Sequence, residues 1–356
     1  MSVTSRTKTI LFFLVLIVCA VKAQSQDSRN YLFNDSHFHL TNYVQEGIDI
    51  RDFLKIMGNK TGRVALFGIP LQQQWSYRVD GDRAPTYYLQ TDAPLYYYSF
   101  TDAWIAMAYR SLSKDEQARV DPMITGFNPT DMYAADHIRR VLKTFPGVFT
   151  GMGEFSIHKE FVSAKVSGEV ASLQDPALDR ILDFCGETGL VVVLHNDVDV
   201  PFAKEGSPPA YLEQTKAVLR RHSKTTIIWA HIGVGRIVRP VTAQGALIEQ
   251  MIQDPAFSHV YYDISWSEVA KYAVSTPETT RAVADMINRH SDRFIFGTDE
   301  VAPPNEEAYM RVYNQYAPLW ALLKPEARDK VLKGNYERIF DQARGRVRAW
   351  EKANLK

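Results

Sequence analysis

The stretch Asn34-Asp-Ser-His37-Phe38-His39-Leu40 decides how the rest of the sequence is interpreted. Side chains two residues apart on a strand point to the same face. A strand here would therefore turn His37 and His39 to one side and Phe38 to the other. Two neighbouring imidazoles offer neutral nitrogen lone pairs to a metal ion. A motif this short also occurs by chance, so the stretch is either part of a metal site or a pair of unrelated strand histidines.

The length and composition are those of a globular protein. A chain of 356 residues suits one large domain or two ordinary ones, and α/β barrels often reach this length as a single domain. A hydrophobic content of 46% is enough for a substantial core. Basic and acidic residues number 41 each, so the chain is formally neutral. This balance argues against a nucleic-acid partner, which usually requires a basic excess.

The N-terminus has the pattern of a secretory signal peptide. Arg6 and Lys8 precede an apolar run over 10–20, and the small residue Ala23 follows shortly after. We expect cleavage after Ala23, which gives a signal peptide over 1–23 and one mature domain over 24–356. The protein would then be exported, periplasmic or secreted, with no stable membrane span; an uncleaved anchor is the alternative. Cleavage removes three basic residues and no acidic one, so the mature charge would be −3.

Strand-like segments recur along the mature chain and alternate with helical patterns. Several of them are continuously apolar, as expected of strands in a sheet that is buried on both faces. Eight such strands predict an α/β fold, a (β/α)8 TIM barrel. An open doubly wound sheet is the alternative, but no Gly-x-Gly-x-x-Gly follows an early strand. The expected strands cover 34–40, 63–70, 120–129, 147–156, 190–198, 226–233, 260–266 and 294–300.

Capping residues set several helix boundaries. Asp131 is a suitable N-cap, Pro176 suits a first helical turn, and Gly189 suits a helix end. An extra helix is expected after the last strand, beyond the barrel itself. The expected helices cover 131–145, 176–188, 209–222, 240–253, 277–290, 306–323 and, for the extra C-terminal helix, 325–349.

A long aromatic insertion follows the second strand, over 71–98. Connections of this length in a compact domain are usually functional or disordered. The many Trp and Tyr side chains argue against disorder. We expect a lid or pocket wall over the barrel mouth, with a packed excursion or a subunit contact as the alternative.

Polar side chains that could bind a metal stand where five of the expected strands end. Barrel enzymes carry their chemistry at the C-terminal ends of the strands. Buried charges without partners are costly, and a divalent cation would remove that cost. The six candidates are His37 and His39 after strand one, Glu154 after strand four, His195 after strand five, His231 after strand six and Asp299 after strand eight.

This pattern resembles the amidohydrolase superfamily of metal-dependent barrel hydrolases, in particular its amidohydrolase-related (amidohydrolase 2) branch. The resemblance covers essentially the whole mature chain. It implies that His37 and His39 bind one metal ion with Asp299, and that His195 and His231 bind a second ion where two are present. In single-metal members His195 would join the first site, and His231 would be left for substrate binding or proton transfer.

Glu154 departs from the most familiar form of that pattern. Phosphotriesterase-like members carry a carboxylated Lys or, in some groups, a Glu after strand four. The pair Gly153-Glu154 is similar to the Gly-Glu of the deoxyribonuclease-like TatD group. Glu154 would therefore bridge two ions; the alternative is a carboxylate that contacts substrate or supports a ligand.

The ligand types imply a reaction class. Nitrogen and carboxylate oxygen suit zinc, with manganese as the alternative, in one or two equivalents. A bound ion lowers the pKa of water from about 16 toward roughly 7. Asp299 would take the water proton and pass it to the leaving group. The metal or His231 would polarise the scissile bond.

The leading hypothesis is a metal-dependent hydrolase that cleaves an amide, ester, lactone or related bond of a small molecule. The alternative is a metal-dependent decarboxylase or hydratase of an aromatic or unsaturated acid. A TatD-like nuclease is disfavoured by the acidic mature charge, and a metal carrier without enzymatic activity is a further option.

Arg236, Lys159 and Trp266 are weaker candidates for substrate contact. The resemblance also suggests a homodimer.

Overall fold

The computed structural model describes residues 30–41, 47–69, 100–160 and 171–355, together with the backbone of two short strands. These two strands, β3 (Gln74–Trp75) and β4 (Leu89–Gln90), pair in parallel. The expected signal peptide over 1–23 lies outside the described residues, and so does almost all of the aromatic insertion over 71–98. The predictions made for these two segments therefore stay predictions.

Nine parallel strands form one sheet in the order β10-β9-β8-β7-β6-β5-β2-β1-β11. Their sequence runs are short and almost wholly buried, as expected of a sheet that is covered on both faces. The α/β barrel prediction is confirmed. The strands are β1 (Phe33–His39), β2 (Thr61–Phe67), β5 (Val120–Ile124), β6 (Gly151–Ser156), β7 (Val191–His195), β8 (Ile227–Trp229), β9 (Val260–Asp263), β10 (Phe294–Ile295) and β11 (Glu300–Val301).

The last two strands close the barrel. β10 pairs with β9, and β11 pairs with β1. Between them, the Phe296 carbonyl accepts from the Ser36 amide at 3.1 Å, and the Asp299 amide donates to the His37 carbonyl at 2.7 Å. The segment 294–301 therefore occupies the eighth strand position, and it holds Asp299 directly beside β1.

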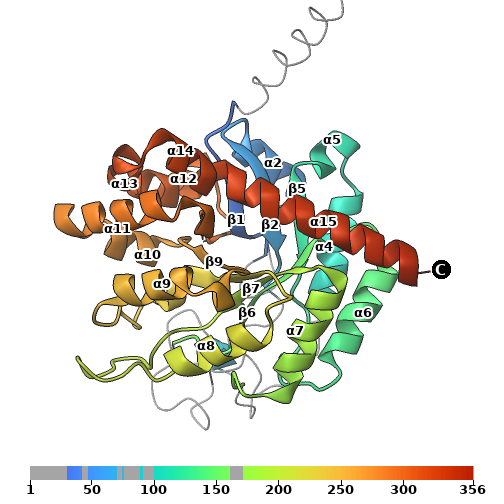
Figure 1. The fold of residues 1–356 in the computed structure, drawn as a ribbon. Coiled ribbons are helices and arrows are strands. Elements are labelled where there is room, and N and C mark those ends of the chain that lie inside the picture. The colour runs from blue at the N-terminus through green and yellow to red at the C-terminus, as the bar shows by residue number, and fades with distance from the viewer. Residues whose placement is uncertain are drawn as a thin grey trace, which may run out of the picture.

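Helices surround the barrel (Figure 1). None of those in the described residues combines the length and apolar character needed to cross a membrane. They are α2 (Ile50–Met57), α4 (Phe100–Arg110), α5 (Lys114–Gln117), α6 (Ala134–Thr144), α7 (Pro176–Thr188), α8 (Leu212–Arg221), α9 (Gln244–Gln253), α10 (Ser267–Ala273), α11 (Pro277–Arg289), α12 (Glu306–Gln315), α13 (Ala317–Leu322), α14 (Pro325–Asp329) and α15 (Asn335–Asn354).

The expected extra C-terminal helix over 325–349 corresponds to α14, a π-helical turn (Lys330–Gly334) and α15. Of these, α15 runs across one end of the barrel (Figure 1, red). Its side chains Tyr336, Ile339 and Phe340 pack into one cluster with inward-facing strand residues such as Val193. Near the start of β5, Asp121 accepts a hydrogen bond from the Tyr336 hydroxyl at 2.8 Å. The helix therefore covers the N-terminal end of the barrel, which leaves the opposite end for chemistry.

Candidate metal centre

The structure brings together all six side chains predicted as metal ligands. His37 and His39 lie at the end of β1, Glu154 on β6 and His195 at the end of β7. His231 lies in the 3-10 turn η1 (Ala230–Gly233) directly after β8, and Asp299 lies between β10 and β11. All are buried except Asp299, whose side chain is 11% exposed. The ends of five strand positions thus meet at one buried centre.

The backbone is left-handed at several points around this centre. The φ angles are 56° at His231, 80° at Trp266 and 53° at Asp299. Residues other than glycine adopt such angles at a cost of about 1–3 kcal/mol, and they concentrate at functional sites. Each of these residues follows the end of a strand, so the turn redirects its side chain. No sequence pattern indicated these turns.

Glu154 lies between two pairs of histidines. Its Oε2 atom is 3.5 Å from His39 Nε2 and 3.8 Å from His37 Nε2. Its Oε1 atom contacts His195 Nδ1 and lies 3.5 Å from His231 Nε2. Each carboxylate oxygen therefore faces a different histidine pair, which is the arrangement that a bridging ligand requires.

Asp299 completes the group around β1. Its Oδ1 atom is 3.3 Å from His37 Nε2 and 3.2 Å from His39 Nε2, and its Oδ2 atom is 3.9 Å from His231 Nε2. Three groups of three described residues have ligand atoms within 4.8 Å of one another. They are His37, His39 and Asp299; Glu154, His195 and His231; and His37, His231 and Asp263.

Two of the histidines also contact side chains that are not among the six predicted ligands. His37 Nδ1 lies 3.0 Å from Asp263 Oδ2, and His231 Nδ1 lies 3.1 Å from Ser265 Oγ. A hydrogen bond at one ring nitrogen fixes the imidazole and directs the other nitrogen toward a metal. Sequence reasoning missed both partners. Asp263 ends the observed β9, whereas the expected strand ran on over 260–266.

His195 is held in a similar way by Asp197. Its Nε2 atom lies 3.1 Å from Asp197 Oδ1, which leaves Nδ1 on the side of Glu154. The neighbouring Asn196 instead directs its amide to Thr215 Oγ1 at 2.9 Å. Of the two residues after β7 that could orient His195, only Asp197 does so.

The protonation states follow from charge pairs inside the barrel. Burial opposes a charge on His37, but Asp299, Asp263 and Glu154 outweigh it and raise the pKa of His37 well above its ordinary value. Burial likewise opposes ionisation of Asp299, yet His37 and the other histidines lower its pKa. The pKa of Glu154 is also lowered, against its burial, by Lys159 and the histidines, so Asp299 and Glu154 attract positive charge into the centre.

A divalent ion fits this donor set. His37 Nε2 and His231 Nε2 are buried and have no hydrogen-bond partner in the described part of the chain. His37 Nε2 and His231 Nε2 both face the carboxylates of Asp299 and Glu154. Buried polar atoms without partners are costly, and a cation shared with two carboxylates would satisfy them.

The three weaker substrate candidates meet beside the centre. Lys159 Nζ lies 3.9 Å from Glu154 Oε1, and the Trp266 ring lies 4.9 Å from the His231 ring. The Arg236 guanidinium is 6.0 Å from the Trp266 ring. They line a cavity of about 350 Å³ whose wall consists of Lys159, Arg236, Trp266, Ser267, Asp299, Glu300, Val301 and Arg311. Sequence reasoning did not single out Glu300 or Arg311.

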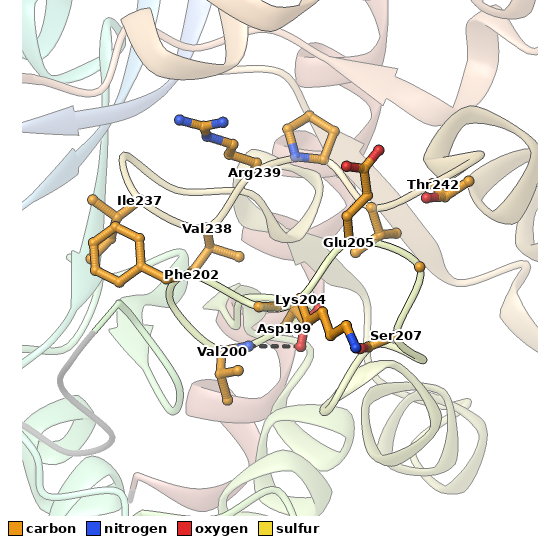
Figure 2. A pocket seen from close by; sticks show the side chains of 14 residues that line it. Asp199, Val200, Phe202, Lys204, Glu205, Ser207, Ile237, Val238, Arg239 and Thr242 are labelled. Carbon is orange, nitrogen blue, oxygen red and sulfur yellow. Dashed lines mark hydrogen bonds between the residues drawn. The ribbon is translucent and has the colours of Figure 1, made fainter.

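A larger hollow of about 590 Å³ lies between the loop after β7 and the loop after η1. Figure 2 shows its labelled side chains, with Phe202 and Ile237 toward one end of the view and Thr242 toward the other. None of the residues that line it is a candidate metal ligand. The smaller cavity, which contains Asp299, is therefore the one adjacent to the chemistry.

Comparisons with known proteins identify the family and the fold. The sequence model of the family described as Amidohydrolase matches residues 35–342. A candidate 2-pyrone-4,6-dicarboxylic acid hydrolase from Pseudomonas putida has a similar structure, with a TM-score of 0.53, 14% identity and coverage of 88% of this chain and 98% of that one. No curated protein sequence matches the chain.

Two further solved structures share the fold. An amidohydrolase from Burkholderia multivorans with bound zinc has a TM-score of 0.52 and 13% identity, and the match covers 87% of this chain and 99% of that one. Dihydroorotase from Campylobacter jejuni has a TM-score of 0.51 and 13% identity, with coverage of 87% and 84%. At these identities the likeness concerns the fold alone.

Proposed function

The chain belongs to the amidohydrolase family of metal-dependent enzymes, and we propose that it hydrolyses an amide, ester, lactone or related bond of a small molecule. The observation that carries this proposal is the position of Glu154, with one carboxylate oxygen toward each histidine pair. A carboxylate shared in this way supports a two-ion centre.

The proposed ligand sets divide around Glu154. His37, His39 and Asp299 would hold one ion, and His195 and His231 would hold the other. Imidazole nitrogen and carboxylate oxygen suit zinc, and manganese is the alternative. The zinc bound by the Burkholderia multivorans amidohydrolase is in keeping with this choice. Were a single ion bound, His231 Nε2 would be left to contact the substrate.

When bound, the metal would acidify a water molecule and polarise the scissile carbonyl. Asp299 is the residue placed to move the proton, because its carboxylate is ionised and it lines the cavity of about 350 Å³. It would accept a proton from the attacking water and deliver it to the leaving group. His37 and His39, 3.3 and 3.2 Å from Asp299 Oδ1, hold that carboxylate in place.

The test replaces Asp299 by Asn in protein reconstituted with zinc. Hydrolysis of a panel of aryl esters, lactones and amides should fall about 10²- to 10⁴-fold in kcat, the usual contribution of a positioned acid–base group. The zinc content should stay near that of the wild type, because the Asn oxygen and the histidines remain. Asp285→Asn, at an exposed position on α11, is the matched control.

Two results would overturn the proposal. One is turnover by Asp299→Asn at the wild-type rate. The other is product formed with release of carbon dioxide and without oxygen from labelled water, which would favour the decarboxylase alternative instead.

A further inference from the structure

The larger hollow of about 590 Å³ is separate from the candidate metal centre. Its wall comes from two loops, one within 199–207 after β7 and the other over 237–242 after η1. None of its lining residues also lines the cavity that contains Asp299. A ligand in the larger hollow would therefore bind without the candidate metal ligands.

The two loops are held by hydrogen bonds at their bases. The Val198 amide donates to the Gly233 carbonyl at 2.8 Å, which joins one loop to the other. The Gln244 side chain closes the second loop, because it accepts from the Val241 amide at 2.9 Å and donates to the Ile232 carbonyl at 2.8 Å. The walls of the larger hollow are therefore fixed by the fold.

Asp199 lies in this wall with a carboxylate that is only partly satisfied. The residue is 6% exposed. Its Oδ1 atom accepts from the Val200 amide at 2.9 Å, drawn in Figure 2, and from the Ala210 amide at 3.0 Å. Within the described residues, Oδ2 has no hydrogen-bond donor and the carboxylate has no ion-pair partner. A buried carboxylate without a cation is costly, so this position favours a ligand that brings a positive charge.

Apolar side chains form another part of the wall. Phe202 and Val200 are 68% and 38% exposed on the first loop. Ile237 and the buried Val238 lie on the second loop, and Figure 2 shows Phe202 and Ile237 toward the same end of the view. Ligand cavities typically combine an apolar lining with a few polar groups that fix the orientation of the ligand.

The other charged side chains of the wall are exposed. They are Lys204, Glu205 and Arg239, and with Asp199 they sum to zero net charge. Exposed charges are solvated, and their ion pairs contribute little. Of the four, only Asp199 is shielded from water by the protein. The preference for one class of ligand therefore depends on Asp199.

We propose that the larger hollow binds a small molecule that carries an ammonium group on an apolar body, such as an arylalkylamine. The ammonium group donates to Asp199 Oδ2, and the apolar body lies against Phe202 and Ile237. This site is separate from the metal centre, so the inference does not rest on the proposed function.

The test measures binding by calorimetry. Zinc-reconstituted protein is titrated with 2-phenylethylamine, which is cationic at pH 7, and with the neutral 2-phenylethanol, which has nearly the same shape. Zinc compensates the carboxylates of the metal centre, so they compete less for the amine. The amine should bind at least about tenfold more tightly than the alcohol, because hydrogen bonds to charged groups are among the stronger polar contacts.

Asp199→Asn removes the charge and keeps an oxygen that accepts from the Val200 and Ala210 amides. Its affinity for 2-phenylethylamine should fall about tenfold or more, and its affinity for 2-phenylethanol should change little. The matched control is Glu205→Gln, which removes an exposed carboxylate from the same wall. That variant should bind the amine like the wild type.

Phe202→Asn tests the apolar part of the wall. Asn accepts the left-handed φ of 57° at this position, so the loop should keep its conformation. The affinity for both probes should fall by the same factor, roughly threefold or more, because an apolar contact is lost. Since Phe202 is exposed, this variant keeps the proposal testable even where Asp199→Asn does not fold.

Equal binding of the two probes by the wild type would overturn the proposal. So would a loss of amine affinity in Glu205→Gln without one in Asp199→Asn, which would place the ammonium group at the exposed edge of the hollow. Amine affinity that is unchanged in both Asp199→Asn and Phe202→Asn would show binding elsewhere on the protein, and it would also overturn the proposal. These results are independent of the hydrolysis panel.

Discussion

The chemistry of the centre depends on how individual imidazoles are held. His37 directs Nδ1 to Asp263, and this leaves the buried Nε2 atom among carboxylates and without a hydrogen-bond partner among the described residues. Asp263 Oδ2 also accepts from Ser265 Oγ at 2.5 Å, so the carboxylate is itself fixed. The orientation of His37, a candidate metal ligand, therefore depends on Asp263 and on the contact that Asp263 makes with Ser265.

Asp263→Asn should weaken metal binding by about 10- to 100-fold, the usual effect of removing such a partner. The neutral amide no longer favours the proton on Nδ1, so Nε2 presents its lone pair less often. Competition with a chromophoric chelator measures the affinity, with Asp285→Asn as the surface control. Wild-type affinity in a folded Asp263→Asn protein would show that His37 does not need this support.

At the residue scale, sequence spacing identified the six candidate ligands that the structure brings together, and it missed the side chains that contact them. The period of two on a strand paired His37 with His39, and strand ends brought His195 into the prediction. Asp263 was missed because its role comes from a neighbour far away in the sequence. His37 and Asp263 are 226 residues apart.

At the element scale, one buried carboxylate joins three segments around the centre. Asp35 Oδ1 accepts from the amides of His37 at 3.0 Å and Thr298 at 2.8 Å. Its Oδ2 atom accepts from the hydroxyls of Thr298 at 2.7 Å and Tyr309 at 2.9 Å. β1, the segment that carries Asp299, and α12 are therefore held together at Asp35.

Asp35→Ala should destabilise the protein by roughly 3 kcal/mol or more, because it leaves two buried amides unpaired at about 1–3 kcal/mol each. Asp35→Asn should cost less, since its oxygen can still accept from both amides. Urea unfolding of the two variants measures the difference. If both variants lost the same amount of stability, the hydrogen bonds at Asp35 would not be the cause.

Asp102 on α4 gives the fold a pH dependence. It accepts hydrogen bonds from the Thr125 and Gly126 amides after β5, at 2.8 and 3.1 Å. Burial nevertheless raises the pKa of Asp102 to about 7. The folded protein holds this proton up to that pH, whereas the unfolded chain loses it near pH 4.

Unfolding therefore releases a proton between about pH 4 and 7, and the Asp102 contribution to the free energy of unfolding falls as pH rises through that window. The slope should reach up to about 1.4 kcal/mol per pH unit in the wild type, relative to Asp102→Asn. Urea unfolding at several pH values tests this. Parallel pH profiles for the two proteins would contradict it.

Capping residues predicted the boundaries of α7 well but not the start of α6, which begins at Ala134 and not at the expected cap Asp131. α7 covers Pro176–Thr188 as expected, because Asp175 caps its first turn and Gly189 ends it at a φ of 86°. The expected helix over 306–323 is instead two helices that meet at Tyr316. Pro318, in the first turn of α13, has no amide hydrogen to continue the first helix.

Strand lengths were predicted less well. The run over 120–129 contains only the five residues of β5, and the eighth strand is interrupted between β10 and β11. Apolar residues continue from the strands into buried loops. Composition therefore does not show where the hydrogen bonds between neighbouring strands end. At the eighth strand, the interruption between β10 and β11 directs the Asp299 side chain toward the candidate metal centre.

At the scale of the whole molecule, stability and chemistry lie at opposite ends of the barrel. α15 covers the N-terminal end, where buried Asp121 pairs with Arg63 at 2.8 Å and with Tyr336. The six candidate ligands lie at the other end, as in barrel enzymes generally. The alternation of strands and helices in the sequence predicted this barrel arrangement, because the arrangement depends only on the order of local patterns along the chain. The signal peptide, export and subunit pairing remain predictions.

The most direct test of the central claim is the metal content of the purified protein after reconstitution with zinc, measured by elemental analysis. A carboxylate placed between two histidine pairs predicts two equivalents per chain, and Glu154→Gln should hold fewer. One equivalent in the wild type would contradict the bridging role of Glu154 and favour the decarboxylase alternative. No metal with either zinc or manganese would contradict the centre itself.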